Sequence, residues 1–163
     1  MSRLGEFAEA AYESVWMCRL SESRLVTPVD PPAIERYGLP PNRPTWPWTY
    51  DYYAHLVAAQ RLLASGEAIN QSQKNTHLAQ AIDQFRAHWS RLKPLRDALF
   101  HPQSKAIPWQ HVHAFFDRIE YRHPVSKEIV WVFTIEELHR PVEELYAAIT
   151  LNGDSSGKYA VRP

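Results

Sequence analysis

An arginine, an acid and a histidine close a strongly apolar helical pattern directly before a proline. Arg96 and Asp97 are adjacent, and His101 follows four residues after Asp97 and precedes Pro102. A guanidinium binds phosphate oxygens through several N–H donors, and an imidazole transfers protons near neutral pH. If the last helical turn is tight, the three side chains converge on one small anion. The group therefore suits chemistry at a phosphate ester, with Asp97 as the partner of Arg96.

The residues before this motif predict the helix that positions it, beginning at about Thr76. Large apolar side chains recur there at alternating steps of four and three, the spacing of one helix face. They are Leu78, Ile82, Phe85, Trp89 and Leu92. If the helix continues past Pro94, Arg96 takes the next position of this stripe, where a guanidinium must be paired or face a cleft. The helix should end near His101, because proline disfavours the α conformation in the residue before it. The helix dipole there favours a protonated imidazole.

The order of arginine, polar residue, three further residues and histidine resembles the R-x(4-6)-H signature of HEPN domains. These are small all-helical proteins, of which many are metal-independent ribonucleases. The resemblance implies that Arg96 contacts the scissile phosphate of an RNA substrate and that Asp97 is the polar second residue. It implies that His101 transfers protons at the 2′-hydroxyl or the leaving oxygen. It further implies a homodimer in which two motifs share one active site.

The resemblance rests on six residues of the chain and implies a toxin or antiviral-defence effector, with an antitoxin or other regulatory protein as a partner. Family members regulated by a nucleotidyltransferase carry a tyrosine two residues after the histidine, and here that residue is Gln103. The resemblance therefore does not extend to regulation by tyrosine modification.

Two alternatives accompany the catalytic interpretation of the motif. Arg96 and Asp97 also suit a structural ion pair beside a helix-terminal histidine, in a non-catalytic protein-interaction module of the same fold. A second arginine and histidine with the same spacing, Arg118 and His123, have Ile119 in the polar position and lie in a strand-like segment. We therefore favour the first pair.

The composition of the chain limits the remaining classes of protein to which it can belong. The chain has 163 residues, a formal net charge of zero and a single cysteine, Cys18. This length fits one domain, and the charge balance predicts no general polyanion-binding surface. Basic residues nevertheless outnumber acids around the motif, where only Asp97 opposes Arg86, Arg91, Lys93, Arg96 and Lys105. A lone cysteine and the absence of a long apolar run predict a cytoplasmic protein with no membrane segment.

No motif indicates a cofactor, and we expect none. The phosphate-binding glycine loops and paired-cysteine patterns of nucleotide and metal sites do not occur in this sequence. His111 and His113 would face one metal on a strand, with Asp117 or His123 as a further ligand. After Pro108 and Trp109 this segment instead reads as a helix, so we expect no metal site.

The fold class that follows is mainly all-α, a HEPN-like bundle of about five helices with at most one small β-hairpin. Residues 1–151 form the expected domain and 152–163 a flexible tail. The first two expected helices cover residues 2–20 and 49–64, and Gly66 terminates the second. A long helix begins at Thr76, a short one follows Pro108 and runs through Val112 to Ile119, and a last one ends at Leu151. Thr134 and Glu137 form a capping box for the last helix. Residues 128–133 are a strand candidate that pairs with 118–122.

A proline-rich stretch separates the first two helices. Seven prolines from Pro28 to Pro47 prevent regular helix in a loop or arm predicted over residues 21–49. Trp46 and Trp48 either pack this arm over the core or clasp a partner, and we favour packing.

Overall fold

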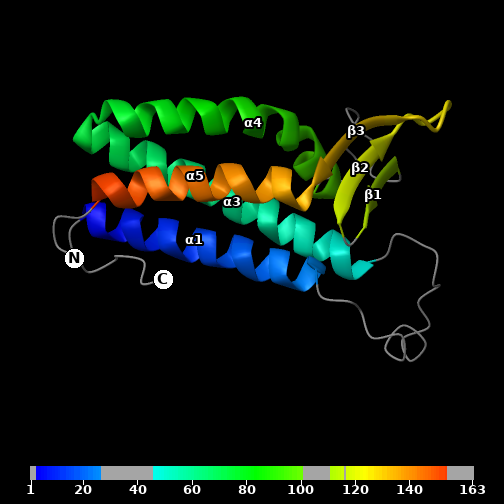
Figure 1. The fold of residues 1–163 in the computed structure, drawn as a ribbon, viewed down its shortest axis with the longest axis horizontal. Helices are drawn as coiled ribbons and strands as arrows, with labels where there is room; N and C mark the ends of the chain where they lie inside the picture. The colour runs from blue at the N-terminus through cyan, green and yellow to red at the C-terminus, as the bar shows by residue number, and fades with distance from the viewer. Residues whose placement is uncertain (1–2, 27–45, 101–110, 116, 154–163) are drawn as a thin grey trace.

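The computed structural model describes residues 3–26, 46–100, 111–115 and 117–153. Within them lie four helices and three strands. In chain order these are α1 (Arg3–Val26), α3 (Trp46–Gln73), α4 (Thr76–Phe100), β1 (Val112–Ala114), β2 (Arg118–Arg122), β3 (Ile129–Thr134) and α5 (Ile135–Gly153). The helices lie side by side as a bundle, with the small sheet at the end where α4 finishes (Figure 1). The expectation of a mainly helical protein is confirmed for these residues.

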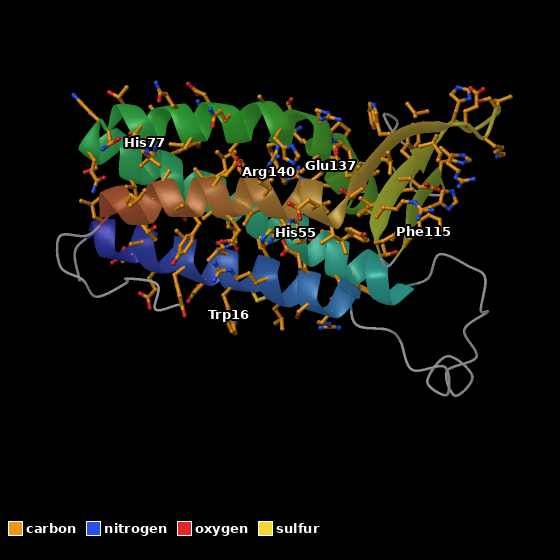
Figure 2. All side chains as sticks on the ribbon, in the orientation of Figure 1. Trp16, His55, His77, Phe115, Glu137 and Arg140 are labelled. Carbon is orange, nitrogen blue, oxygen red and sulfur yellow. The ribbon has the colours of Figure 1, made fainter. Side chains whose placement is uncertain are left out.

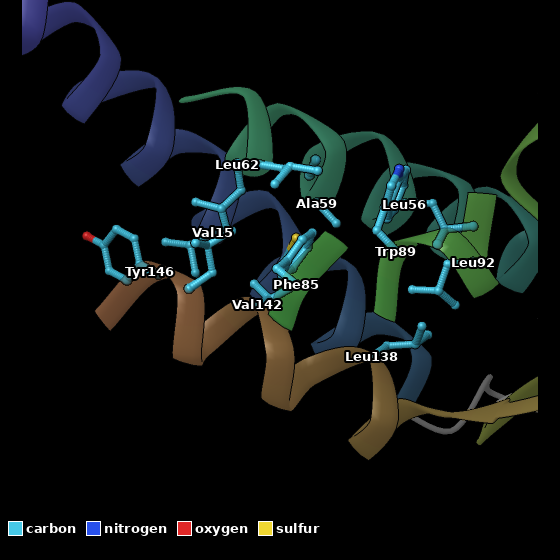
Figure 3. Packing of buried hydrophobic residues seen from close by; sticks show 14 of the residues in the cluster. Val15, Leu56, Ala59, Leu62, Phe85, Trp89, Leu92, Leu138, Val142 and Tyr146 are labelled. Carbon is cyan, nitrogen blue, oxygen red and sulfur yellow. The ribbon is translucent and has the colours of Figure 1, made fainter. Parts of the chain in front are cut away.

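One apolar face of each helix points into the bundle. Figure 2 shows His55 lying between helices, whereas Trp16 on α1 points outward. In Figure 3, Val15 of α1, Leu62 of α3, Phe85 of α4 and Val142 of α5 converge from the four helices. Burying a large aliphatic or aromatic side chain stabilises a fold by about 1.5–3 kcal/mol. The burial of these side chains, which their helical spacing places on one face of each helix, is thus the main source of the bundle's stability.

The three strands form one antiparallel sheet in the order β1-β2-β3. Ile119 of β2 pairs with Ala114 on one side and Phe133 on the other, and all three side chains are buried. The predicted pairing of 118–122 with 128–133 is confirmed. The predicted capping box is also confirmed, because the Glu137 amide donates to Thr134 Oγ1 at 3.2 Å and Glu137 Oε2 accepts from the Thr134 amide at 2.9 Å.

The helix bounds differ from the predicted ones. α1 continues to Val26, because no proline interrupts residues 21–26, and α3 begins at Trp46, because proline is tolerated in a first helical turn. Gly66 does not end α3. A Cβ at Gly66 would lie 3.3 Å from Ile149 Cδ1, so this glycine lets α5 approach α3 closely. α3 ends instead before Lys74, which has a left-handed φ of 52°.

The predicted fourth helix over Val112–Ile119 is wrong. Val112–Ala114 forms β1, which pairs with β2, and Ala114 is buried. The expected single hairpin is therefore a three-stranded sheet. Three of the predicted features lie outside the described residues, namely 27–45 of the arm, His101 with Gln103, and 154–163 of the tail.

Candidate functional site

Arg96 lies in the last turns of α4 and is held by two helices. Its Nε donates to Asp97 Oδ1 at 2.9 Å, its Nη2 donates to the same oxygen, and its Nη1 donates to Gln60 Oε1 on α3. The Arg96 side chain is 19% exposed. The expectation that this guanidinium is paired is thus confirmed.

The apolar stripe of α4 does not run through Arg96, contrary to the prediction. Beyond Pro94 the fully buried positions are Leu95 and Ala98. Arg96 and Asp97 therefore lie beside the stripe, where their charged ends reach the surface and their stems stay partly covered.

Asp97 joins a second cation to the group. Lys93 Nζ lies 3.2 Å from Asp97 Oδ2, one helical turn away. Burial raises the pKa of Asp97, but the hydrogen bonds from Arg96 and Lys93 lower it further, so the net shift is downward. One carboxylate thus faces two cations, and the group keeps a net positive charge. A guanidinium has five N–H donors, and within the described residues three of them go to Asp97 and Gln60. The other two donate to no described residue.

The third residue of the motif cannot be placed beside the first two. α4 is described to Phe100, and His101, the next residue, lies outside the described part of the chain. The described site therefore consists of Arg96, Asp97, Lys93 and Gln60, at the end of α4 from which His101 follows.

The second arginine and histidine pair forms no composite site. Arg118 binds Asp117 at 3.0 Å and lies over the Phe115 ring. His123 Nδ1 instead accepts the Ser126 amide at 3.2 Å in the turn after β2. Five residues of strand span about 16 Å, so the two side chains do not meet at one phosphate.

The sheet holds a further ionic group that the sequence did not reveal. Glu120 is fully buried and pairs with Arg122 at 2.6 Å and Arg118 at 3.4 Å. His113 of β1 lies opposite it, and burial followed by the nearby Arg122 lowers the pKa of His113. Among the described residues, no three acidic, histidine or cysteine side chains have the geometry to hold a metal ion.

A buried polar group inside the bundle was also missed. Glu22 Oε2 lies 2.6 Å from His139 Nδ1, and Glu22 Oε1 lies 3.2 Å from His55 Nδ1 without hydrogen-bond alignment. His55 is 1% exposed, and neither ring nitrogen has a hydrogen-bond partner within the described residues. The sequence contained a signal for this group, because Glu22 continues the helical spacing of the apolar residues Val15 and Cys18.

An open groove of about 530 Å³ runs between α4 and α5. Its polar lining includes His77, His88 and Arg140 over an apolar floor that contains Phe85. Neither Arg96 nor Asp97 lines it. The groove is thus separate from the motif.

No protein-family model matches this sequence, and neither the curated proteins nor the solved structures include a match. Across the described helices, none is both long and apolar enough to span a bilayer. The chemistry of the Arg96 site therefore follows from its own residues.

Proposed function

We propose that this chain is a metal-independent endoribonuclease of HEPN type. The observation that supports it most is the Arg96 guanidinium, which is fixed by Asp97 and Gln60 and has two N–H donors without an acceptor among the described residues. A cation held in place before substrate arrives stabilises charge that develops during reaction without reorganising. His101 follows Arg96 at the spacing of the HEPN signature that this motif resembles.

The reaction uses the substrate's own nucleophile. His101 accepts the proton of a ribose 2′-hydroxyl, and the oxygen attacks the adjacent phosphorus. The bond from phosphorus to the 5′-oxygen then breaks, and that oxygen takes a proton from an imidazolium. The products are a 2′,3′-cyclic phosphate and a 5′-hydroxyl. Arg96 donates to the phosphate oxygens, where negative charge accumulates, and Asp97 orients Arg96.

The proposal also includes the oligomeric state of the enzyme, its location and its partners. The bundle is of HEPN-like type, and a homodimer contributes two motifs to one site. The enzyme acts in the cytoplasm on RNA as a toxin or antiviral-defence effector, and an antitoxin or regulatory protein restrains it.

The test is cleavage of a defined RNA in the presence of EDTA. Wild-type protein should cut it and leave 2′,3′-cyclic phosphate ends, and a deoxyribose at the cut position should block cleavage. His101→Ala should abolish cleavage, whereas His123→Ala, the matched change in the second pair, should retain it. Wild-type rates in His101→Ala, or activity lost with EDTA, would refute the proposal.

A non-catalytic interaction module is the second candidate, and the outer face of α1 favours it. Tyr12, Trp16, Met17 and Leu20 are exposed on this helix, and Trp16 points away from the bundle (Figure 2). Contiguous exposed apolar surface marks protein interaction sites. If the wild-type protein binds RNA or a protein but leaves RNA uncut, this candidate replaces the enzyme.

A further inference from the structure

Two cations of α4 share one acid beside the motif. Lys93 Nζ lies 3.2 Å from Asp97 Oδ2, and Arg96 Nε donates to Asp97 Oδ1 at 2.9 Å. Within the described residues, Asp97 is the one acid that either cation contacts. One positive charge of this group therefore remains uncompensated there.

A helix-stabilising role does not explain the pair of Lys93 and Asp97. The acid lies close to the C-terminal end of α4 at Phe100, where the helix dipole favours cations and disfavours anions. The lysine also precedes the acid, which is the less favourable order of a pair four residues apart. Lys93 is 59% exposed, and an exposed ion pair adds little to stability. The arrangement therefore suits the binding of an anion better than the stabilisation of α4.

We propose that Lys93 binds the RNA phosphate next to the one that Arg96 contacts. The inference rests on the proposed function, since it adds a second phosphate subsite to the same site and makes the substrate a strand with at least two successive phosphates. An ammonium is a compact charge with three N–H donors that binds phosphate without a fixed orientation. Within the described residues Lys93 donates to Asp97 alone.

The positions of the two cations match two neighbouring phosphates of one strand. Residues three apart on a helix are neighbours, with Cβ atoms about 5–6 Å apart. Successive phosphates of RNA are separated by a single ribose. Asp97 and Gln60 hold Arg96 in place, whereas the flexible four-carbon stem of Lys93 lets its ammonium follow the strand. Arg96 thus fixes the scissile phosphate, and Lys93 binds the adjacent one.

The other cations of the described helix α4 do not fit this subsite. Arg86 binds one acid on α3 and another on α4, so the acids around it outnumber the cation. Arg91 lies 5.1 Å from the centre of the Phe133 ring, against the sheet. Lys93 is thus the one cation of this helix that shares an acid with Arg96.

RNA binding tests the subsite without cleavage. A short single-stranded RNA with 2′-O-methyl groups lacks the nucleophile, so fluorescence anisotropy measures its affinity alone. For single strands, the logarithm of the binding constant falls with the logarithm of salt concentration by about 0.7 for each phosphate contact. Lys93→Gln should weaken binding and reduce this slope by about 0.7.

Arg140→Gln is the matched control for the binding assay. Arg140 and Glu144 form a pair on α5 with the same spacing and order as Lys93 and Asp97, at 3.6 Å, and Arg140 is exposed. The variant removes one positive charge away from the motif and should keep the wild-type slope. Circular dichroism should show an unchanged fold in both glutamine variants, because both cations are exposed.

Cleavage in EDTA tests which phosphate Lys93 contacts. An oligonucleotide with a single ribose has one cleavable bond, and the phosphate before or after that bond is replaced by an uncharged methylphosphonate. In the wild type, one of these replacements should raise KM with little change in kcat. In Lys93→Gln, KM should already be raised, and the same replacement should raise it no further. Arg140→Gln should respond as the wild type does.

The outcomes separate this inference from the proposed function. RNA cleavage by the wild type, together with an unchanged salt slope in Lys93→Gln or an equal reduction in Arg140→Gln, would overturn the subsite and leave the ribonuclease standing. Additive effects of Lys93→Gln and the methylphosphonate on KM would do the same. A slope reduced in Lys93→Gln alone, in a protein that leaves RNA uncut, would support the subsite and refute the ribonuclease. A wild-type protein that binds no RNA would overturn both.

Discussion

Replacing Arg96 with lysine keeps the positive charge and removes the forked geometry. Arg96 reaches Asp97 and Gln60 with three different nitrogens, and a lysine ammonium in the same space cannot reach both acceptors and a phosphate at fixed angles. If the role of Arg96 is charge alone, Arg96→Lys retains activity. If oriented N–H donors stabilise the transition state, activity falls.

The expected size of the effect follows from the geometry. Two N–H donors of Arg96 have no acceptor among the described residues, and under the proposed function they bind the phosphate. Losing one preorganised donor at a developing oxyanion costs about 10²–10³ in rate. The fold should remain, because the Arg96 and Asp97 side chains are partly exposed and such ion pairs contribute about 0–1 kcal/mol. We therefore expect Arg96→Lys to lower single-turnover cleavage in EDTA by about 10²-fold or more, with little change in the midpoint of thermal unfolding.

Arg86 provides the matched control. It lies on the same helix and also binds two acceptors, Glu67 at 2.9 Å and Asp83 at 3.1 Å, but away from the motif. Arg86→Lys should cleave at the wild-type rate. Equal activity in the two lysine variants, or an equal loss in both, would show that Arg96 has no specific role at the phosphate.

Two further predictions concern the bundle. Gly66→Leu should lower the free energy of unfolding by about 1–3 kcal/mol in urea melts, because Ile149 Cδ1 lies 3.3 Å from the Cβ position. The control Ala64→Leu, at an exposed residue of the same helix, should change the free energy of unfolding little. Equal effects of the two substitutions would contradict the packing argument. Burial, and next the nearby Arg91, lowers the pKa of His88 in the folded state. The contribution of neutral His88 to stability is therefore complete above its unfolded-state pKa and is lost as pH falls through its folded-state pKa. His88→Gln should flatten the decline of the unfolding free energy between about pH 7 and 5, and an unchanged slope would refute this prediction.

Local chemistry made some elements predictable. Thr134 and Glu137 satisfy each other's backbone groups without help from the rest of the chain, so four residues suffice to mark the start of α5. The apolar stripe of α4 is equally local up to Leu92. Beyond Pro94 the prediction fails by one position, because Leu95 rather than Arg96 enters the core. A one-residue shift at the end of a helix decides whether a cation is buried or reaches the surface.

Elements that depend on distant partners were not predictable in this way. Val112–Ala114 is three residues long and is a strand because β2 pairs with it, so its own spacing contains too little periodicity to exclude helix. Gly66 is a local helix terminator by propensity, but the approach of Ile149 from α5 gives it a packing role. In both cases the deciding contacts come from residues at least five positions away in sequence.

The charged groups inside the fold follow the same logic. Glu22, His55 and His139 come from three different helices, and the buried Glu120 pairs with Arg118 and Arg122 of the same strand. A buried charge is tolerated when partners compensate its desolvation. His55, with no hydrogen-bond partner for either nitrogen among the described residues, is an exception within the core. Arg96 differs from Glu22, His55 and Glu120, because its side chain is 19% exposed and its charged end reaches the surface. Arg86 also binds two acceptors and is more exposed, so partial exposure with two acceptors does not by itself make an anion site, and the comparison of the two lysine variants decides whether the motif gives Arg96 a specific role.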